Sequence, residues 1–195
     1  MKNLLATLLL LLCLMGSVFA QNADSGNKAS GGQNTFREGD KIVNIGFGLG
    51  SSLYAGSHYT SKTPPISASF ELGMKDNLFD EKSSLGIGGY LGYTGAKWEE
   101  SGFGWKYKSI VVGVRGAVHY QLVDKLDTYS GLMLGYNIVS SSSFGTTWGA
   151  SASAGGGIAY NWFIGGRYYF SDKIAGMVEL GYGVAILNLG VAIKL

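Results

Sequence analysis

The sequence predicts an all-β protein, a single eight-stranded antiparallel up-and-down barrel that crosses a membrane, and three observations support this. The chain ends in a run (187–195) in which Leu, Leu, Val, Ile and Leu alternate with Asn, Gly, Ala and Lys. Charged residues are 14% of the chain and glycines 32 of 195 residues, against about 25% and about 7% in ordinary domains. Mean hydropathy is +0.16, although no segment beyond the N-terminal region approaches the length of a membrane-spanning helix. Strands in which apolar residues alternate with small or polar ones satisfy all three observations.

The first 20 residues are expected to be a cleaved signal peptide. Lys2 supplies the positive start, residues 4–15 the apolar core, and residues 18–20 (VFA) a small-residue cleavage site. Cys13 follows Leu12, where a lipoprotein signal requires a small residue, so we expect cleavage and not lipidation. The remaining chain has no cysteine, and its stability cannot come from disulfides.

Two further segments follow the signal peptide. Residues 21–35 (QNADSGNKASGGQNT) are polar and lack periodicity, which predicts a disordered periplasmic leader. Residues 36–195 are predicted to form the barrel as one domain. Its strands are expected at residues 41–54, 65–75, 84–98, 109–122, 128–140, 157–170, 175–183 and 187–195.

Each strand is predicted from alternation with a period of two, which separates an apolar set from a small or polar set. The apolar sets are, in chain order, Val43, Ile45, Phe47 and Leu49; Ile66, Ala68, Phe70, Leu72 and Met74; Leu85, Ile87, Leu91 and Tyr93; Ile110, Val112, Val114, Val118, Tyr120 and Leu122; Leu132, Leu134, Tyr136 and Ile138; Ile158, Tyr160, Trp162, Ile164, Tyr168 and Phe170; Val178, Leu180 and Tyr182; and Leu187, Leu189, Val191, Ile193 and Leu195. Because successive side chains of a strand point to opposite faces, each set lines one face of the sheet.

Alternation alone does not tell which face is outside, since a soluble ligand-binding barrel alternates too. The polar face of a soluble barrel would meet water and carry about 25–35% charged residues. Here that face is mostly Gly, Ala, Ser, Asn and Thr, and many charges lie in predicted turns: Asp76, Asp80, Glu81, Lys82, Asp124, Lys125 and Asp127. Aromatic residues near strand ends fit interfacial girdles: Tyr54, Trp98, Tyr120, Tyr136, Tyr168, Phe170 and Tyr182. We therefore expect the apolar face in lipid, with a soluble ligand-binding β-barrel as the second alternative.

The connections alternate in character. Short charged turns are predicted at 76–82, 123–127 and 171–173, and longer connections rich in Gly, Ser, Thr and Trp at 56–64, 99–104 and 141–156, with a tight hairpin at 183–185. Short periplasmic turns and long outer loops are typical of outer-membrane barrels, so both termini are expected in the periplasm. Phe144 and Trp148, in the largest outer loop, are the candidate outer-loop surface.

Several charged residues fall on the predicted inward face: Glu71, Lys75, Arg115, His119, Arg167, Glu179 and Lys194. Charges inside a narrow barrel are costly unless they are paired. We expect Glu71, Arg115, Arg167 and Glu179 to form a structural lumen charge network that closes the barrel. The alternative is a polar path, which would make the protein a narrow porin-like channel for small solutes.

The sequence offers no catalytic, cofactor-binding or metal-binding residues that we would single out. His58 and His119 are predicted at opposite ends of the barrel, and the adjacent Ser57 and His58 do not by themselves make a nucleophile and base. No carboxylate cluster has metal-ligand spacing. The glycine-rich stretches 46–50 and 155–157 open no predicted helix and no Lys-Ser/Thr follows them, which excludes a phosphate loop. The net charge of +2 does not indicate a nucleic-acid partner.

Three segments carry a resemblance to a known family: residues 36–40 (FREGD), 162–183 (WFIGGRYYFSDKIAGMVELGYG) and 187–195 (LNLGVAIKL). The chain after its leader resembles small Gram-negative outer-membrane barrels of the OmpX, OmpW and opacity-protein kind, especially the short versions of Bacteroidetes. The resemblance implies a monomer in outer-membrane lipid and lipopolysaccharide, inserted by the barrel-assembly machinery. It implies a structural or surface-interaction role with no enzymatic activity, and it names no extracellular ligand. Such barrels usually end in an aromatic residue, whereas this chain ends in Leu195.

Overall fold

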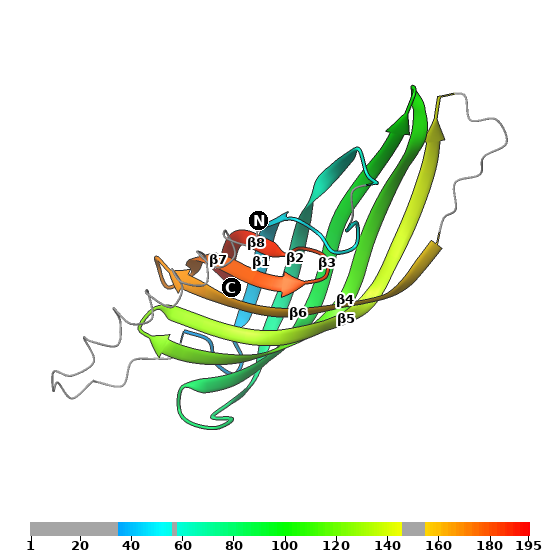
Figure 1. Ribbon diagram of the computed structural model, residues 1–195. Helices are drawn as coiled ribbons and strands as arrows, with labels where there is room; N and C mark the ends of the chain where they lie inside the picture. The colour runs from blue at the N-terminus through cyan, green and yellow to red at the C-terminus, as the bar shows by residue number, and fades with distance from the viewer. Residues whose placement is uncertain (1–34, 56–57, 146–154) are drawn as a thin grey trace. The chain divides into compact units, whose positions relative to one another are not determined.

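The computed structural model describes residues 35–55, 58–145 and 155–195. In this part of the chain eight antiparallel strands close into a barrel in sequence order, as Figure 1 shows. The strands are β1 (Lys41–Leu49), β2 (Ser61–Asp76), β3 (Ser83–Glu100), β4 (Phe103–Val123), β5 (Leu126–Phe144), β6 (Gly155–Tyr169), β7 (Ile174–Tyr182) and β8 (Leu187–Lys194). The predicted fold class is confirmed. Among the described residues, no helix is long and apolar enough to span a membrane.

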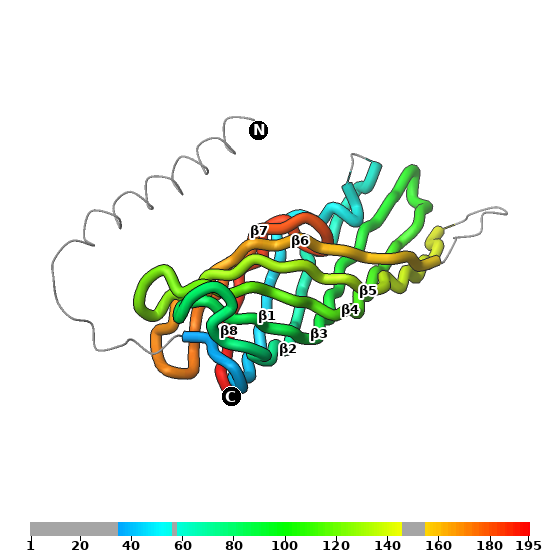
Figure 2. The backbone as a smooth tube through the Cα atoms, turned by 90° about the horizontal axis from the view of Figure 1, so that it is seen from below, coloured from blue at the N-terminus to red at the C-terminus, as the bar shows by residue number. Residues whose placement is uncertain are grey.

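The ring closes through the first and last strands. β1 pairs with β8 from Ile42↔Lys194 to Leu49↔Leu187, so both ends of the ladder are fixed. The backbone N–H of Leu195 also donates to the carbonyl of Lys41 at 2.9 Å. In Figure 2 the start of β1 and the end of β8 accordingly lie side by side. In a closed ring no strand has an unpaired edge where all eight strands run side by side. The backbone N–H and C=O groups of such an edge would otherwise face lipid without a hydrogen-bond partner.

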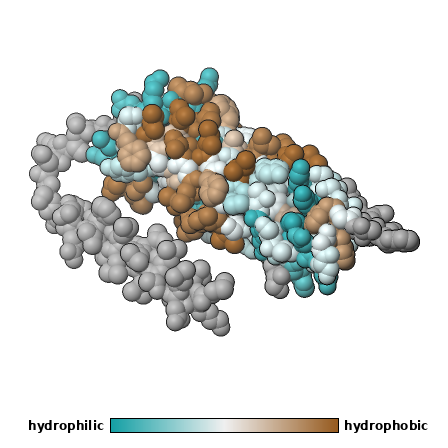
Figure 3. Space-filling view, turned by 90° about the horizontal axis from the view of Figure 1, so that it is seen from above, coloured by the Kyte–Doolittle hydropathy of each residue, from teal (hydrophilic) through white to brown (hydrophobic). Residues whose placement is uncertain are grey.

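The outer wall of the barrel is apolar. Alternate residues are exposed along each strand, and they include Ile45 (57% exposed), Val114 (63%) and Leu134 (60%). Their neighbours in sequence, such as Asn44 and Arg115, are buried in the lumen. In Figure 3 hydrophobic residues cover the middle of the visible wall, and hydrophilic ones gather toward its two ends. The prediction that the apolar face points outward is confirmed.

One end of the barrel carries long projecting strands. β3, β4, β5 and β6 have 18, 21, 19 and 15 residues, whereas β1, β7 and β8 have 8 or 9. In Figures 1 and 2 the surplus length extends beyond the ring at the end opposite to the start of β1 and the end of β8. We call the two ends the hairpin end and the terminus end.

The predicted loops at the hairpin end were too long. The connection predicted at 99–104 is a tight turn in which Ser101 (φ 50°) and Gly102 (φ 85°) both have positive φ, as a two-residue hairpin requires. Likewise β5 continues to Phe144 and β2 begins at Ser61, inside the loops predicted at 141–156 and 56–64. Interstrand pairing continues through polar sequence, which apolar periodicity does not detect.

Three outward or inward assignments were wrong, those of Lys75, Tyr54 and Trp98. Trp98 falls on the same face of β3 as the buried Thr94 and Ala96 and is partly buried, so it is not on the outer wall. Lys75 is exposed, because a register shift between Gly73 and Lys75 interrupts the alternation of β2. Tyr54 is not a girdle residue: β1 ends at Leu49, and Tyr54 is buried with its hydroxyl 2.7 Å from Ser109 Oγ. The predicted girdle residues Tyr120, Tyr136, Tyr168, Phe170 and Tyr182 are exposed on the outer wall.

Candidate functional site

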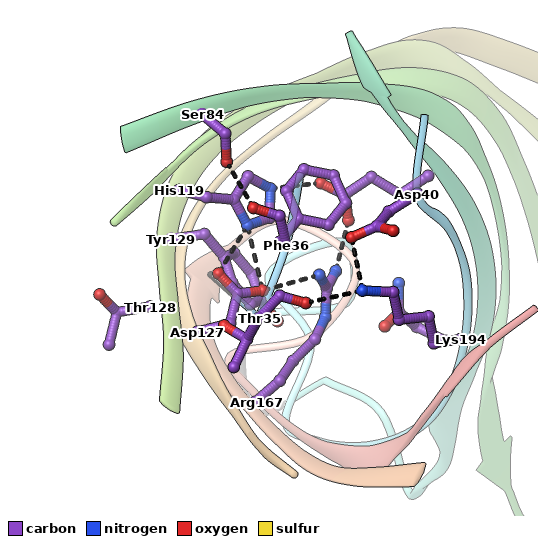
Figure 4. A network of polar contacts seen from close by, with 12 residues as sticks. Thr35, Phe36, Asp40, Ser84, His119, Asp127, Thr128, Tyr129, Arg167 and Lys194 are labelled. Atoms are coloured by element: carbon purple, nitrogen blue, oxygen red, sulfur yellow. Dashed lines mark hydrogen bonds and ion pairs between the residues drawn. The ribbon is translucent and has the colours of Figure 1, made fainter. Parts of the chain in front are cut away.

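The lumen near the terminus end holds a cluster of four charged side chains, Glu71, His119, Asp127 and Arg167, all buried (Figure 4). Arg167 bridges two carboxylates: its Nη1 lies 3.1 Å from Asp127 Oδ2, and its Nη2 donates to Glu71 Oε2. These residues come from β2, β4, β5 and β6, so the cluster ties opposite walls of the barrel together.

His119 lies between the two carboxylates of this cluster. Its Nε2 is 2.6 Å from Glu71 Oε1, and its Nδ1 is 2.9 Å from Asp127 Oδ1. Each contact needs an N–H, and an imidazolium carries one on both ring nitrogens. With His119 in that form the two carboxylates are balanced by two cations. The room for this contact comes from Gly86, where a Cβ would lie only 2.5 Å from Glu71 Oε1.

A second ion pair lies farther along the lumen. Arg115 Nη2 is 2.7 Å from Glu179 Oε1, and both side chains are buried. The Tyr129 hydroxyl donates to the same Glu179 oxygen at 2.9 Å. The Arg115 guanidinium also stacks 4.1 Å from the Phe163 ring centroid. These partners replace part of the hydration lost on burial, although the buried Arg115 Nε has no hydrogen-bond partner among the described residues.

Residues 35–40 close the terminus end, and we call them the N-terminal stopper. Phe36 is 2% exposed and stacks on His119, with ring centroids 4.0 Å apart. The stopper is fixed by hydrogen bonds to three strands: Thr35 N–H donates to Gln121 Oε1 at 2.7 Å, Ser84 Oγ to the Phe36 carbonyl at 3.2 Å, and Gly39 N–H to the Gly73 carbonyl at 2.9 Å. Figure 4 shows Phe36 and Thr35 inside the ring of strands.

Little free space is left beside the Arg115–Glu179 pair. The cavity lined by Tyr90, Asn161, Phe163 and Glu179, among others, has a volume of about 10 Å³. A single water molecule needs about that much room. The arrangement can therefore hold charges in place at this height of the lumen.

The structure brings the four predicted lumen residues into two pairs, Glu71 with Arg167 and Arg115 with Glu179. Sequence reasoning missed Asp127, which it assigned to a turn, and the stopper residue Phe36. Asp127 lies two residues before Tyr129 and six before Met133, so it falls on the same inward face of β5. This alternation could have predicted its position in the lumen.

The other candidate residues are not members of this four-residue cluster. Lys194 is partly exposed at the terminus end, where its Nζ is 2.6 Å from Asp40 Oδ2. His58 is exposed in the connection between β1 and β2, at the hairpin end, and does not meet His119. Phe144 lies at the end of β5, whereas Trp148 and Ser57 lie outside the described residues. Within the described ranges no group of three or more His, Cys, Asp or Glu side chains could hold a metal ion.

Comparison with known proteins identifies the fold. No protein-family model matches the sequence, and no curated protein matches it. Among solved structures, the chain is similar to Ail, the attachment invasion locus protein of Yersinia pestis, in complex with the heparin analogue sucrose octasulfate: TM-score 0.51, 12% identity, 80% of this chain and 95% of that one. Neisserial surface protein A is similar at TM-score 0.43 and 16% identity, over 80% of this chain and 95% of that one. At 12% identity the likeness to Ail shows a shared fold and nothing further.

Proposed function

We propose that the protein is an integral barrel of the bacterial outer membrane with a lumen closed by side chains, and that its role is structural or surface-interacting and not enzymatic. The observation that carries the proposal is the combination of an apolar outer wall with buried, paired charges inside. A soluble ligand-binding barrel would need the reverse arrangement, with an apolar cavity inside and charges outside.

The apolar wall has the height of a bilayer core. On β4 the outward residues from Ile110 to Leu122 are apolar or aromatic apart from one glycine. About 12 steps of about 3.3 Å, tilted by about 40°, give a height of about 30 Å, close to the hydrocarbon thickness. Aromatic residues lie on the same wall toward the terminus end, including Tyr120, Tyr168 and Phe170, as an interfacial girdle requires.

The contacts inside the lumen favour a closed barrel and argue against a channel. Every charged group of the two ion-pair clusters has an opposite charge in contact with it, and the stopper covers the terminus end. A solute or ion would have to separate buried pairs, which costs several kcal/mol per pair. The same pairs fix the register of β2, β4, β5, β6 and β7 relative to one another.

Export and topology complete the proposal. Residues 1–20 act as the signal peptide and residues 21–35 as a periplasmic leader whose last residue, Thr35, begins the stopper. The terminus end then lies in the periplasm and the hairpin end outside. The barrel-assembly machinery inserts the chain as a monomer in contact with outer-membrane lipid and lipopolysaccharide. The long β3–β4 and β5–β6 hairpins then present their polar strand ends to the outside, where a surface-interaction role would be exercised.

A liposome assay tests this function. The protein purified from outer membranes is reconstituted beside a known porin, and insertion is verified by a heat-dependent shift in gel mobility. We expect insertion without swelling in small sugars, while the porin vesicles swell. Swelling by the inserted protein would establish the narrow channel instead, and partition into the aqueous phase without detergent would establish the soluble barrel.

A further inference from the structure

The outer wall carries an apolar groove toward the hairpin end. It has a volume of about 810 Å³ and crosses β8, β1, β2, β3 and β4. Ile66, Leu91 and Ile110 line it and are 52%, 52% and 43% exposed, and the small side chain of Ala68 lies among them. A concave apolar surface on a lipid-facing wall is a place where one acyl chain makes more contacts than it would on a flat wall.

Three lysines follow this groove on the same face of the sheet. Lys97 is on β3, and Lys106 and Lys108 are on β4; we call them the outer lysine cluster. Lys108 is two residues from Ile110, so both side chains point outward, about 6.6 Å apart along the strand. The cluster therefore begins where the apolar wall ends, at the level expected for lipid headgroups.

The outer lysine cluster brings like charges together, which lowers the stability of the sheet. Lys97 and Lys106 are direct partners across the β3–β4 ladder, where like charges destabilise a sheet. Both ammonium groups lie over the Phe144 ring, at 4.7 Å and 5.4 Å from its centroid. Glu99 pairs with Lys97 and compensates one charge.

Apart from Lys97 across the β3–β4 ladder, the residues paired with Lys106 and Lys108 are neutral. Lys106 is opposite Ser142, and Lys108 is opposite Ser140 and Gly95. Both side chains are exposed. Glu99 thus leaves an excess positive charge that an anionic group could neutralise.

We propose that this face binds a phosphorylated lipid of the outer leaflet, with one acyl chain in the groove and a phosphate on Lys106 and Lys108. The proposal rests on the membrane location proposed above and deepens it by naming the lipid chemistry and the residues. A free anion would use the lysines alone, and an uncharged lipid would use the groove alone. Because the two features are continuous on one face, they fit an amphiphile with an anionic head.

Native mass spectrometry in detergent micelles tests the proposal on the full protein purified from outer membranes. The probes are phosphatidic acid, phosphatidylcholine with the same chains, and inorganic phosphate. The double variant K106Q/K108Q removes the phosphate contacts, and K82Q/K173Q is its charge-matched control at the terminus end, where both lysines are exposed. Ala68→Trp fills the groove.

We expect K106Q/K108Q to bind phosphatidic acid about 30-fold more weakly, since each surface lysine contributes about fivefold toward binding of an anionic lipid, and to bind phosphatidylcholine as before. Ala68→Trp should weaken the binding of both lipids, and K82Q/K173Q should leave the binding of both unchanged. Equal binding of the two lipids by the wild type, or phosphatidic acid binding by K106Q/K108Q within about twofold of wild type, would overturn the proposal. Displacement of phosphatidic acid by inorganic phosphate would assign a free-anion site, and a dimer abolished by Ala68→Trp would assign the groove to a second copy; either result also overturns it. The heat-dependent gel shift, measured for every variant, separates these outcomes from failure of the barrel to insert.

Discussion

Replacement of Arg115 by methionine tests the lumen network at the pair whose geometry is simplest. Methionine keeps much of the arginine volume and removes the guanidinium, so Glu179 loses a cation whose Nη2 lies 2.7 Å from its Oε1. Glu179 is only 6% exposed, and water cannot take over the role of the lost partner.

The expected magnitude follows from what remains around Glu179. Removing one member of a buried ion pair costs about 3–5 kcal/mol, because it leaves an uncompensated charge. The Tyr129 hydroxyl and Asn188 Nδ2, at 2.9 Å and 3.4 Å, still donate to the carboxylate. We therefore place the loss in free energy of unfolding at the lower end, about 3 kcal/mol. The double variant R115M/E179Q removes the orphaned charge, and we expect a coupling energy of about 2 kcal/mol between the two positions.

Urea unfolding in detergent micelles, followed by tryptophan fluorescence, measures these values as shifts in midpoint at constant slope. Glu99→Gln is the matched control, since it breaks the partly exposed Lys97–Glu99 pair and should cost less than about 1 kcal/mol. A loss below about 1 kcal/mol in R115M, or single-variant losses that add within about 0.5 kcal/mol in the double variant, would refute the paired network.

Two further predictions concern the terminus end. Phe36→Ala removes the buried ring of the stopper and should lower the free energy of unfolding by about 3 kcal/mol in the same assay, with faster amide hydrogen exchange at residues 35–40; unchanged values would show that the stopper is not held by this ring. In the exposed turn between β2 and β3, slight desolvation raises the pKa of Asp80, but hydrogen bonds from the Lys82 backbone N–H and the Tyr120 hydroxyl outweigh it and hold the pKa below its usual range. The stability linked to Asp80 is present above its unfolded pKa and is lost as the pH falls through the folded value, and Tyr120→Phe should raise that value in a carbon-13 NMR titration; an identical titration curve in the variant would contradict this.

Strand existence and facing could be predicted because they depend on local alternation. The terminal run 187–195 and the strand around Val112 and Val114 carry a period of two over many residues, and both form the strands expected. Lys75 shows the limit, since a single register shift after Gly73 moved it to the other face without any change in the sequence pattern. The hairpin at Ser101–Gly102 was missed because pairing there involves polar residues.

The composition of the lumen could be predicted, but its contacts could not. The alternation of each strand predicted that Glu71 and Arg167 point into the lumen. Their contact depends on closure of the ring, because β2 and β6 are not neighbours in the sheet. Asp127 was assigned to a turn because it lies only two residues after Lys125, the last turn residue. Phe36 enters the lumen through a segment with no periodicity of its own, so no local pattern could place it.

Single-channel conductance in a planar bilayer tests the closed lumen most directly. The wild-type protein, shown to be inserted by its heat-dependent gel shift, should give no stable current steps, because Arg115–Glu179 and the Glu71–Arg167–Asp127 bridge block the path. Arg115→Ala and Glu179→Ala remove side-chain volume and one charge each, and should give small or irregular steps at most. Stable, reproducible wild-type steps that change in size or ion selectivity in these two variants would contradict the account and identify a channel through the lumen.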